Sequence, residues 1–189
     1  MKKRLLGLLF MTYGVFASNS ELLTAKQGAP AHISDNASLM VWEDGEYKTK
    51  VKGSNEFSCL IWADEQGTFE PSCFNAAAIE AVLPVYQYQR KMLEKGMKIE
   101  DIHSNIAKKA ETGHFPSPQP GAVVYMMSKQ NKFYDHFGNR LVNVKPHLML
   151  YSSKLNAESL EFNGKEGLPG FYSDYPHLSV IHIHTSDNH

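Results

Sequence analysis

The chain has 189 residues, of which 42% are hydrophobic and 11% aromatic, and its 19 basic residues nearly balance its 20 acidic ones, giving a formal net charge of -1. Apolar side chains in this proportion argue against wholesale disorder, and the length suits one domain. A near-neutral chain lacks the basic excess of most DNA- and RNA-binding domains, so we expect no nucleic-acid partner.

The start of the chain has the pattern of a secretory signal peptide over residues 1–17. Lys2, Lys3 and Arg4 form a basic start, a largely apolar run follows, and small residues lead to a cleavage position after Ala17. The apolar run is shorter than the ~20 residues that a membrane-spanning helix needs, and no later segment approaches that length. We therefore predict a soluble protein without a transmembrane anchor, exported to the periplasm or the extracellular medium.

After the signal peptide we predict an N-terminal arm over residues 18–38 and a single domain over residues 39–189. The domain opens with segments whose apolar residues are typical of β-strands, and the dipeptide Asp44-Gly45 is typical of a tight hairpin turn. The sheet is therefore expected to begin as an antiparallel meander. The predicted strands of this part are residues 39–43, 47–52 and 57–63.

The two cysteines, Cys59 and Cys73, are predicted to form a disulfide. An isolated pair of cysteines in an exported protein is usually oxidised. Thirteen residues separate the two, which differs from the Cys-x-x-Cys spacing of metal and redox sites. A zinc half-site and a catalytic thiol are the alternatives. We expect the intervening residues 64–74, which include Gly67 and Pro71, to form a loop.

Two helices are predicted in the middle of the chain, over residues 76–95 and 99–111. Asn75 is a suitable N-cap for the first helix, and Gly96 is suited to the left-handed conformation that ends it. Pro84 lies inside the first helix, where it should kink the helix or split off its first turn. The second helix carries isoleucines at helical spacing on one side.

The last third of the chain returns to strands, predicted over residues 122–128, 147–151 and 178–184. A polar loop over residues 129–145 separates the first two strands, and a longer irregular stretch separates the last two. Strands, then helices, then strands again indicate an α+β fold. We expect a mostly antiparallel sheet with two main helices packed on one face.

The chain holds nine histidines, and two of them, His182 and His184, suggest a metal site. They are two residues apart on a predicted strand, so both imidazoles point to the same face. Two imidazoles on one face suit a zinc, copper or iron ion, and Asp187 and His189 follow closely. The alternative is a partly exposed edge strand on which the histidines bind nothing.

His147 is a further candidate, because it follows Pro146 at the start of a predicted strand, with Asp135 in the loop before it. It could act as a general base or as a metal ligand together with His182 and His184, with Asp135 orienting its ring. The alternative is that His147 caps the strand by bonding to the loop backbone. We favour this structural role, because the sequence contains no recognisable nucleophile, phosphate-binding, dinucleotide or zinc-protease motif.

Three stretches, YKTKVKGSNEFSC (47–59), PQPGAVVYMMSK (118–129) and PHLM (146–149), resemble an uncharacterised family of exported bacterial proteins. They occur in the same order, and the resemblance spans roughly residues 20–152. It implies export and a single domain, and no activity. The chain departs from the family at Lys145, where we expect a histidine.

These observations leave two functional hypotheses. The first, which we favour, is an exported protein without catalytic activity that binds a small molecule or a partner in the cell envelope. The second is an exported metal-dependent hydrolase that uses His147, His182 and His184, with Asp135 as orienting group or base. The first is supported by the absence of a complete catalytic motif, and the second by the density of histidines.

Overall fold

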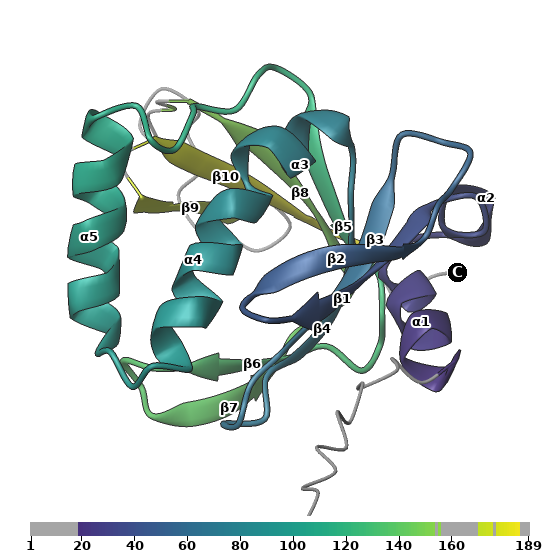
Figure 1. The fold of residues 1–189 in the computed structure, drawn as a ribbon, viewed down its shortest axis with the longest axis horizontal. Helices are drawn as coiled ribbons and strands as arrows, with labels where there is room; N and C mark the ends of the chain where they lie inside the picture. The colour runs from purple at the N-terminus through teal and green to yellow at the C-terminus, as the bar shows by residue number, and fades with distance from the viewer. Residues whose placement is uncertain (1–18, 154, 156–169, 176, 186–189) are drawn as a thin grey trace, which may run out of the picture.

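The computed structural model describes residues 19–153, 155, 170–175 and 177–185, and within them one sheet organises the fold (Figure 1). The strands of this sheet are β1 (Ser38–Glu43), β2 (Glu46–Val51), β3 (Ser58–Ala63), β4 (Phe69–Phe74), β5 (Ala122–Met126), β6 (Lys132–Asp135), β7 (Arg140–Asn143), β8 (His147–Ser152), β9 (Gly170–Tyr175) and β10 (Leu178–His184). Their order is β2-β1-β3-β4-β5-β8-β10-β9, and the β6–β7 hairpin branches from β4. Neighbours run antiparallel except β1 and β3, so the prediction of an α+β fold with a mostly antiparallel sheet is confirmed.

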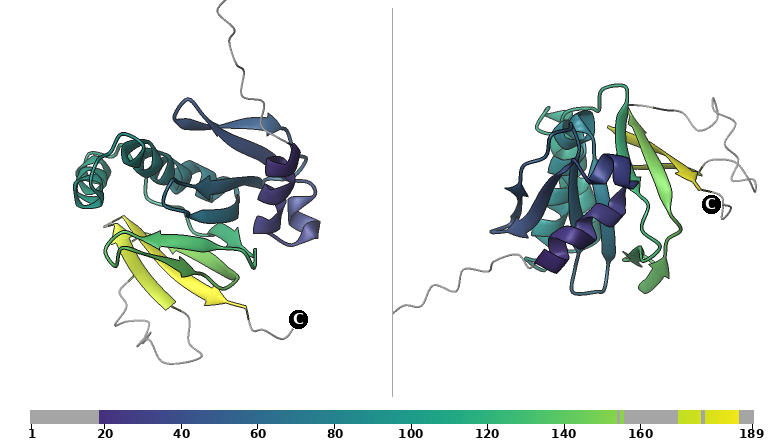
Figure 2. Two further views of the ribbon diagram at one scale, coloured as in Figure 1. Left: turned by 90° about the horizontal axis from the view of Figure 1, so that it is seen from below. Right: turned by 90° about the vertical axis from the view of Figure 1, so that its right-hand side faces the viewer.

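Helices cover both faces of the strands that begin the sheet (Figure 2). One face carries the two longest helices of the described residues, α4 and α5, together with the short α3, and the opposite face carries the N-terminal helices. None of them is long and apolar enough to cross a bilayer in the part of the chain that the structure describes. The helices are α1 (Asn19–Ala25), η1 (Lys26–Gly28), α2 (Ala31–Ser34), α3 (Ala76–Ala81), α4 (Leu83–Leu93) and α5 (Ile99–Glu111).

The helical region follows the predicted capping and breaking signals. The side-chain oxygen of Asn75 accepts a hydrogen bond from the backbone N–H of Ala78 at 3.0 Å, which caps α3. Pro84 lies in the first turn of α4 and separates it from α3, as its missing N–H requires. Gly96 follows α4 with a φ of 75°, the left-handed conformation that glycine adopts at low cost.

Three segments that we predicted to be irregular contain strands. Residues 64–74 hold β4, residues 129–145 hold the β6–β7 hairpin, and the last irregular stretch holds β9. Pro71 suggested a loop, because proline cannot donate to a central strand. Pro71 is tolerated because one side of β4 has no partner strand at this position. On that side β4 pairs with β6 at Phe69 and with β5 only from Cys73 onward.

The predicted disulfide between Cys59 and Cys73 is confirmed, and it joins two neighbouring strands instead of closing a loop. The two cysteines are directly opposite each other on β3 and β4, and both are fully buried. They belong to a small core on the face opposite α3–α5, where Ala25, Ala29 and Leu39 pack around them. The described residues of the predicted N-terminal arm therefore pack on the sheet.

Candidate functional site

Strands β8 and β10 carry the three predicted metal ligands on one face of the sheet. In their antiparallel register His184 is directly opposite His147, and His182 is opposite Met149. Paired residues, and residues two apart on a strand, point to the same face. All three imidazoles therefore share the face of Met149, which belongs to the main core beneath α3–α5.

The three rings form a cluster at the margin of the core. The ring centroids of His147 and His182 are 4.9 Å apart, with nearly parallel planes at 9°. The ring of His184 lies 5.7 Å from that of His147 and 6.4 Å from that of His182. His147 is buried, His182 is half-buried and His184 is exposed, so solvent reaches the cluster from the end that His184 occupies.

The surroundings favour the neutral form of His147 and His182. Nδ1 of His147 lies 2.8 Å from the carbonyl oxygen of Lys145. A carbonyl oxygen only accepts hydrogen bonds, so Nδ1 carries the proton and Nε2 of the neutral ring keeps its lone pair. Burial lowers the pKa of His147. It lowers the pKa of His182 to about 3, and the charges of His147 and His184 add to this effect.

The side chains of the cluster are not arranged around a common centre. As they stand, no three His, Cys, Asp or Glu residues in the described ranges could hold a metal ion. The faces of the His147 and His182 rings are stacked, which directs their nitrogens past each other. Asp187 and His189, which we also considered, lie outside the described residues.

The structure places Asp135 at the end of β6, beside the turn of the β6–β7 hairpin, where its carboxylate bonds to the backbone of that turn. Its Oδ1 accepts hydrogen bonds from the backbone N–H groups of Phe137 and Gly138 at 3.1 and 2.9 Å. The bond from Gly138 is the main reason why the pKa of Asp135 lies below its ordinary value. No contact joins Asp135 to His147 within the described residues. His147 bonds instead to the loop backbone, the contact that the structural interpretation describes.

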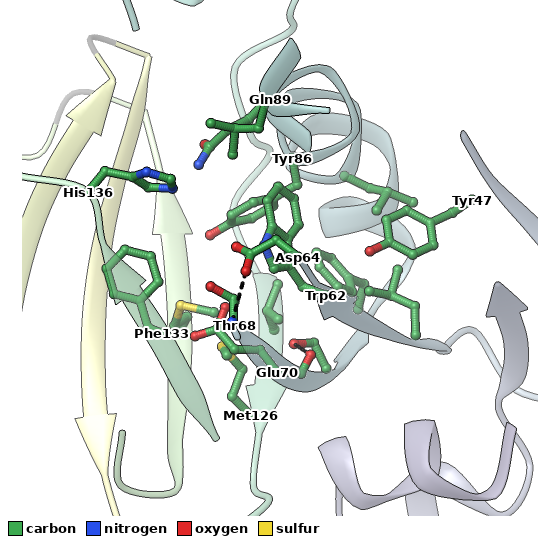
Figure 3. A pocket seen from close by; sticks show the side chains of 17 residues that line it. Tyr47, Trp62, Asp64, Thr68, Glu70, Tyr86, Gln89, Met126, Phe133 and His136 are labelled. Carbon is green, nitrogen blue, oxygen red and sulfur yellow. Dashed lines mark hydrogen bonds between the residues drawn. The ribbon is translucent and has the colours of Figure 1, made fainter. Parts of the chain in front are cut away.

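A pocket lies beside the histidine cluster, on the same face of the sheet, and we did not predict it. Strands β3 and β4 line it with α4, and Phe133 and His136 from the β6–β7 hairpin close one side (Figure 3). It encloses about 50 Å³. Met126 and Met149 line the pocket, and Met126 is paired with His147 across β5 and β8. The pocket and the cluster are therefore neighbours through buried methionines.

Aromatic side chains form the wall of the pocket beneath α4. The ring of Tyr86 packs edge-on against Trp62 and Phe74, at centroid distances of 5.5 and 6.2 Å. Nη1 of Arg90 donates a hydrogen bond to the hydroxyl oxygen of Tyr47 at 2.8 Å. These contacts hold the aromatic rings against the helix and the sheet, so this wall of the pocket is preorganised for binding.

Two carboxyl groups, from Asp64 and Glu70, line the same pocket. Asp64 accepts hydrogen bonds from the backbone N–H groups of Gln66 and Thr68 at 3.0 and 2.9 Å. Glu70 is directly opposite Trp62 in the register of β3 and β4, and its carboxyl group has no hydrogen bond or ion pair with any described residue. Burial raises the pKa of Glu70 to about 8, and the charge of Asp64 adds to the increase.

The charge of this region is acidic. No lysine or arginine is among the described residues that line the pocket. An open groove continues from it along Trp62 and Asp64 and adds Glu65, Glu94 and Arg90. Arg90 is occupied by an ion pair with Glu94, Nε to Oε1 3.3 Å. Three carboxyl groups and one guanidinium therefore line this groove, a balance that favours cations over anions.

The pocket was missed because its central strand was predicted to be a loop. Thr68, Glu70 and Ser72 alternate with Phe69 and other apolar residues, and all three polar side chains line the pocket. This period of two is the signal that could have revealed β4.

Comparisons with protein-family models, with curated proteins and with solved structures found no match. The resemblance to exported bacterial proteins therefore stays a prediction. The pocket and the histidine cluster are the two features whose geometry and charge point to a function.

Proposed function

We propose that this protein is exported and binds a small organic amine in the pocket between β4, α4 and the β6–β7 hairpin. The observation that carries the proposal is the lining of the pocket, which combines aromatic rings and two carboxyl groups with no lysine or arginine among the described residues. Aromatic faces and carboxylates both attract a cation. An anionic ligand would meet like charge at Asp64.

The size of the pocket limits what it accepts. Its volume is about 50 Å³, and a single water molecule requires ~10–15 Å³ of such space. The enclosed part therefore suits an ammonium group with a few attached carbon atoms. The open groove beside Trp62 and Asp64 offers room for the rest of a longer molecule.

Glu70 is the residue that recognises the positive charge of the amine. With a pKa of about 8, its carboxyl group is mostly protonated in the empty pocket at neutral pH. A bound ammonium group favours the ionised form, so binding is coupled to release of a proton. We therefore expect the affinity for amines to rise as the pH increases from 6 to 8.

Export is supported by the basic and apolar pattern of residues 1–17. When the full chain is produced in a bacterium, the mature protein should begin at Ser18 and accumulate in the periplasm or the medium. Replacement of Lys2, Lys3 and Arg4 by glutamate should hold the protein in the cytoplasm with its N-terminus intact. A cytoplasmic, uncleaved wild-type protein would overturn this part of the proposal.

Calorimetric titration tests the binding function. The probes are ethanolamine, choline and putrescine, compared with ethylene glycol and acetate as neutral and anionic ligands of similar size. We expect saturable binding of at least one amine, weakened ~10-fold or more by Glu70→Gln or by Trp62→Leu. Glu80→Gln, on the exposed side of α3, is the matched control and should bind as the wild type does.

Two results would contradict the proposal. Binding of the neutral or anionic probes alone would show that the carboxyl groups do not select the ligand. Amine binding that is unchanged in both pocket variants would place the site elsewhere. Mass spectrometry of the recovered amine then separates binding from catalysis, because a chemically altered amine would make the protein an enzyme.

A further inference from the structure

We propose that the amine is a linear polyamine, with one ammonium group in the pocket beside Glu70 and the next in the open groove beside Glu65 and Glu94. This inference rests on the proposed function and names the class of amine that the site accepts. Three features support it: the continuity of groove and pocket, the residues at their junction, and the charges that face the groove.

The groove continues the pocket along α4. Trp62, Asp64 and Leu93 line both of them. The pocket encloses about 50 Å³, whereas the groove offers about 610 Å³. At a rise of ~1.5 Å per residue, α4 advances roughly 10 Å from Tyr86, beside the pocket, to Leu93, where the groove begins. A ligand that occupies both parts is therefore elongated and has a small group at the end that enters the pocket.

The residues at the junction suit a chain in which hydrocarbon and charge alternate. Trp62 and Leu93 are apolar and offer contact to methylene groups. Carboxyl groups lie on either side, with Glu70 in the pocket and Glu65 in the groove, and Asp64 lines both parts. A linear polyamine has this alternation, because short methylene chains separate its ammonium groups. Each ammonium group can then pair with a carboxylate while the methylene groups pack on apolar side chains.

The charges that face the groove are negative. Arg90 is the one basic residue among the described residues that line it, and its side chain is 13% exposed, whereas that of Glu94 is 47% exposed. The guanidinium of Arg90 bonds to the Tyr47 hydroxyl at 2.8 Å and lies 4.4 Å from the centroid of the Trp42 ring. Glu65 is exposed and has no hydrogen bond or ion pair with any described residue. A second ammonium group therefore meets an unpaired carboxylate at Glu65 and the exposed carboxylate of Glu94.

Calorimetric titration with three amines that share a butyl chain tests the proposal. The probes are n-butylamine, putrescine and spermidine, which carry one, two and three amino groups. We expect the affinity to rise in this order, with spermidine bound ~10-fold or more tightly than n-butylamine, because the part already bound holds the next ammonium group near a carboxylate. Added salt should weaken the binding of spermidine more than that of n-butylamine.

A double variant separates the groove from the pocket. Glu65→Gln combined with Glu94→Gln removes two charges from the groove, and both residues are exposed, so the variant is suited to retain the fold, which circular dichroism checks. It should weaken spermidine ~5-fold or more and leave n-butylamine unchanged. The matched control combines Glu80→Gln with Glu111→Gln, which removes the same charge from exposed positions outside the groove. This control should bind all three amines as the wild type does.

The outcomes distinguish this inference from the function on which it rests. Equal affinities for n-butylamine and spermidine would overturn the assignment to polyamines. Equal weakening of spermidine in the groove variant and the control would also overturn it, because the effect would then come from net charge. In both cases the amine function stands if Glu70→Gln still weakens n-butylamine. If none of the three amines binds, the proposed function and this inference are both wrong.

Discussion

The pocket carboxyl group of Glu70 should make the folded protein less stable as the pH rises. Burial raises its pKa from an ordinary 4.5 to about 8. A group whose pKa is higher in the folded state binds its proton more tightly there, so protonation favours folding. This contribution to the free energy of unfolding is complete below pH 4.5, declines between pH 4.5 and 8, and is lost above pH 8.

The size of the effect follows from the difference between the two pKa values. Each tenfold change in proton affinity corresponds to ~1.4 kcal/mol, so the interval from 4.5 to about 8 sets an upper limit of ~5 kcal/mol. The Glu70 side chain is only partly buried, and solvent in the pocket screens its charge. We therefore expect the wild type to lose ~2 kcal/mol over this interval through Glu70.

Urea unfolding between pH 4.5 and 9 measures this contribution, with Glu70→Gln as the variant and Glu80→Gln as the control. The interval from pH 7 to 8 is the most informative. His147 and His182 have lowered pKa values, so their contribution to stability increases with pH and is complete above their ordinary pKa of 6.5. Glu70→Gln should flatten the pH dependence and exceed the wild type in stability at pH 8.

Parallel pH profiles of the two proteins would contradict a raised pKa of Glu70. If wild type and Glu70→Gln give parallel curves of unfolding free energy against pH, Glu70 ionises in the folded protein as it does in the unfolded chain. The carboxyl group would then lie in an aqueous environment, and the pocket would lack the burial on which charge recognition depends. Glu80→Gln should parallel the wild type throughout.

Substitutions at three places in the structure test the packing of the fold. Replacing Cys59 and Cys73 together by alanine should lower the free energy of unfolding by ~3 kcal/mol, because the cross-link spans 14 residues, and unchanged urea denaturation would contradict this. Asn75→Ala should cost ~2 kcal/mol, since it removes the cap of α3 and two bonds to the start of β5, and Asn75→Asp should cost less in the same assay. Gly28→Ala should cost ~1–3 kcal/mol, because its Cβ would lie 2.7 Å from the backbone nitrogen of Ser72, and an unchanged melting temperature would argue against that close packing.

Features that depend on a few neighbouring residues could be predicted from the sequence. Asp44 and Gly45 both have positive φ angles, 55° and 79°, as the β1–β2 hairpin turn requires. The cap at Asn75, the break at Pro84 and the end of α4 at Gly96 follow from side-chain and backbone chemistry within one helical turn.

The histidine cluster was partly predictable. The common face of His182 and His184 follows from the period of two in a strand, which is a local property. The arrival of His147 beside them depends on the pairing of β8 with β10, between segments far apart in the chain. All three residues were predicted as candidates from the sequence. Which imidazoles are neighbours depends on the register of these two strands.

The pocket could not be predicted from the sequence, because it forms only through tertiary contacts. Residues 64–74 contain Gly67 and Pro71, which locally favour a loop, and only the partial pairing of β4 with its neighbours makes a strand with Pro71 possible. Nothing in the local sequence distinguishes Glu70 from any other glutamate. Its pKa is raised because the sheet, α4 and the β6–β7 hairpin enclose it. Local chemistry thus determined turns, caps and helix ends, whereas burial, which sets the chemistry of the site, depends on contacts between segments that are distant in the chain.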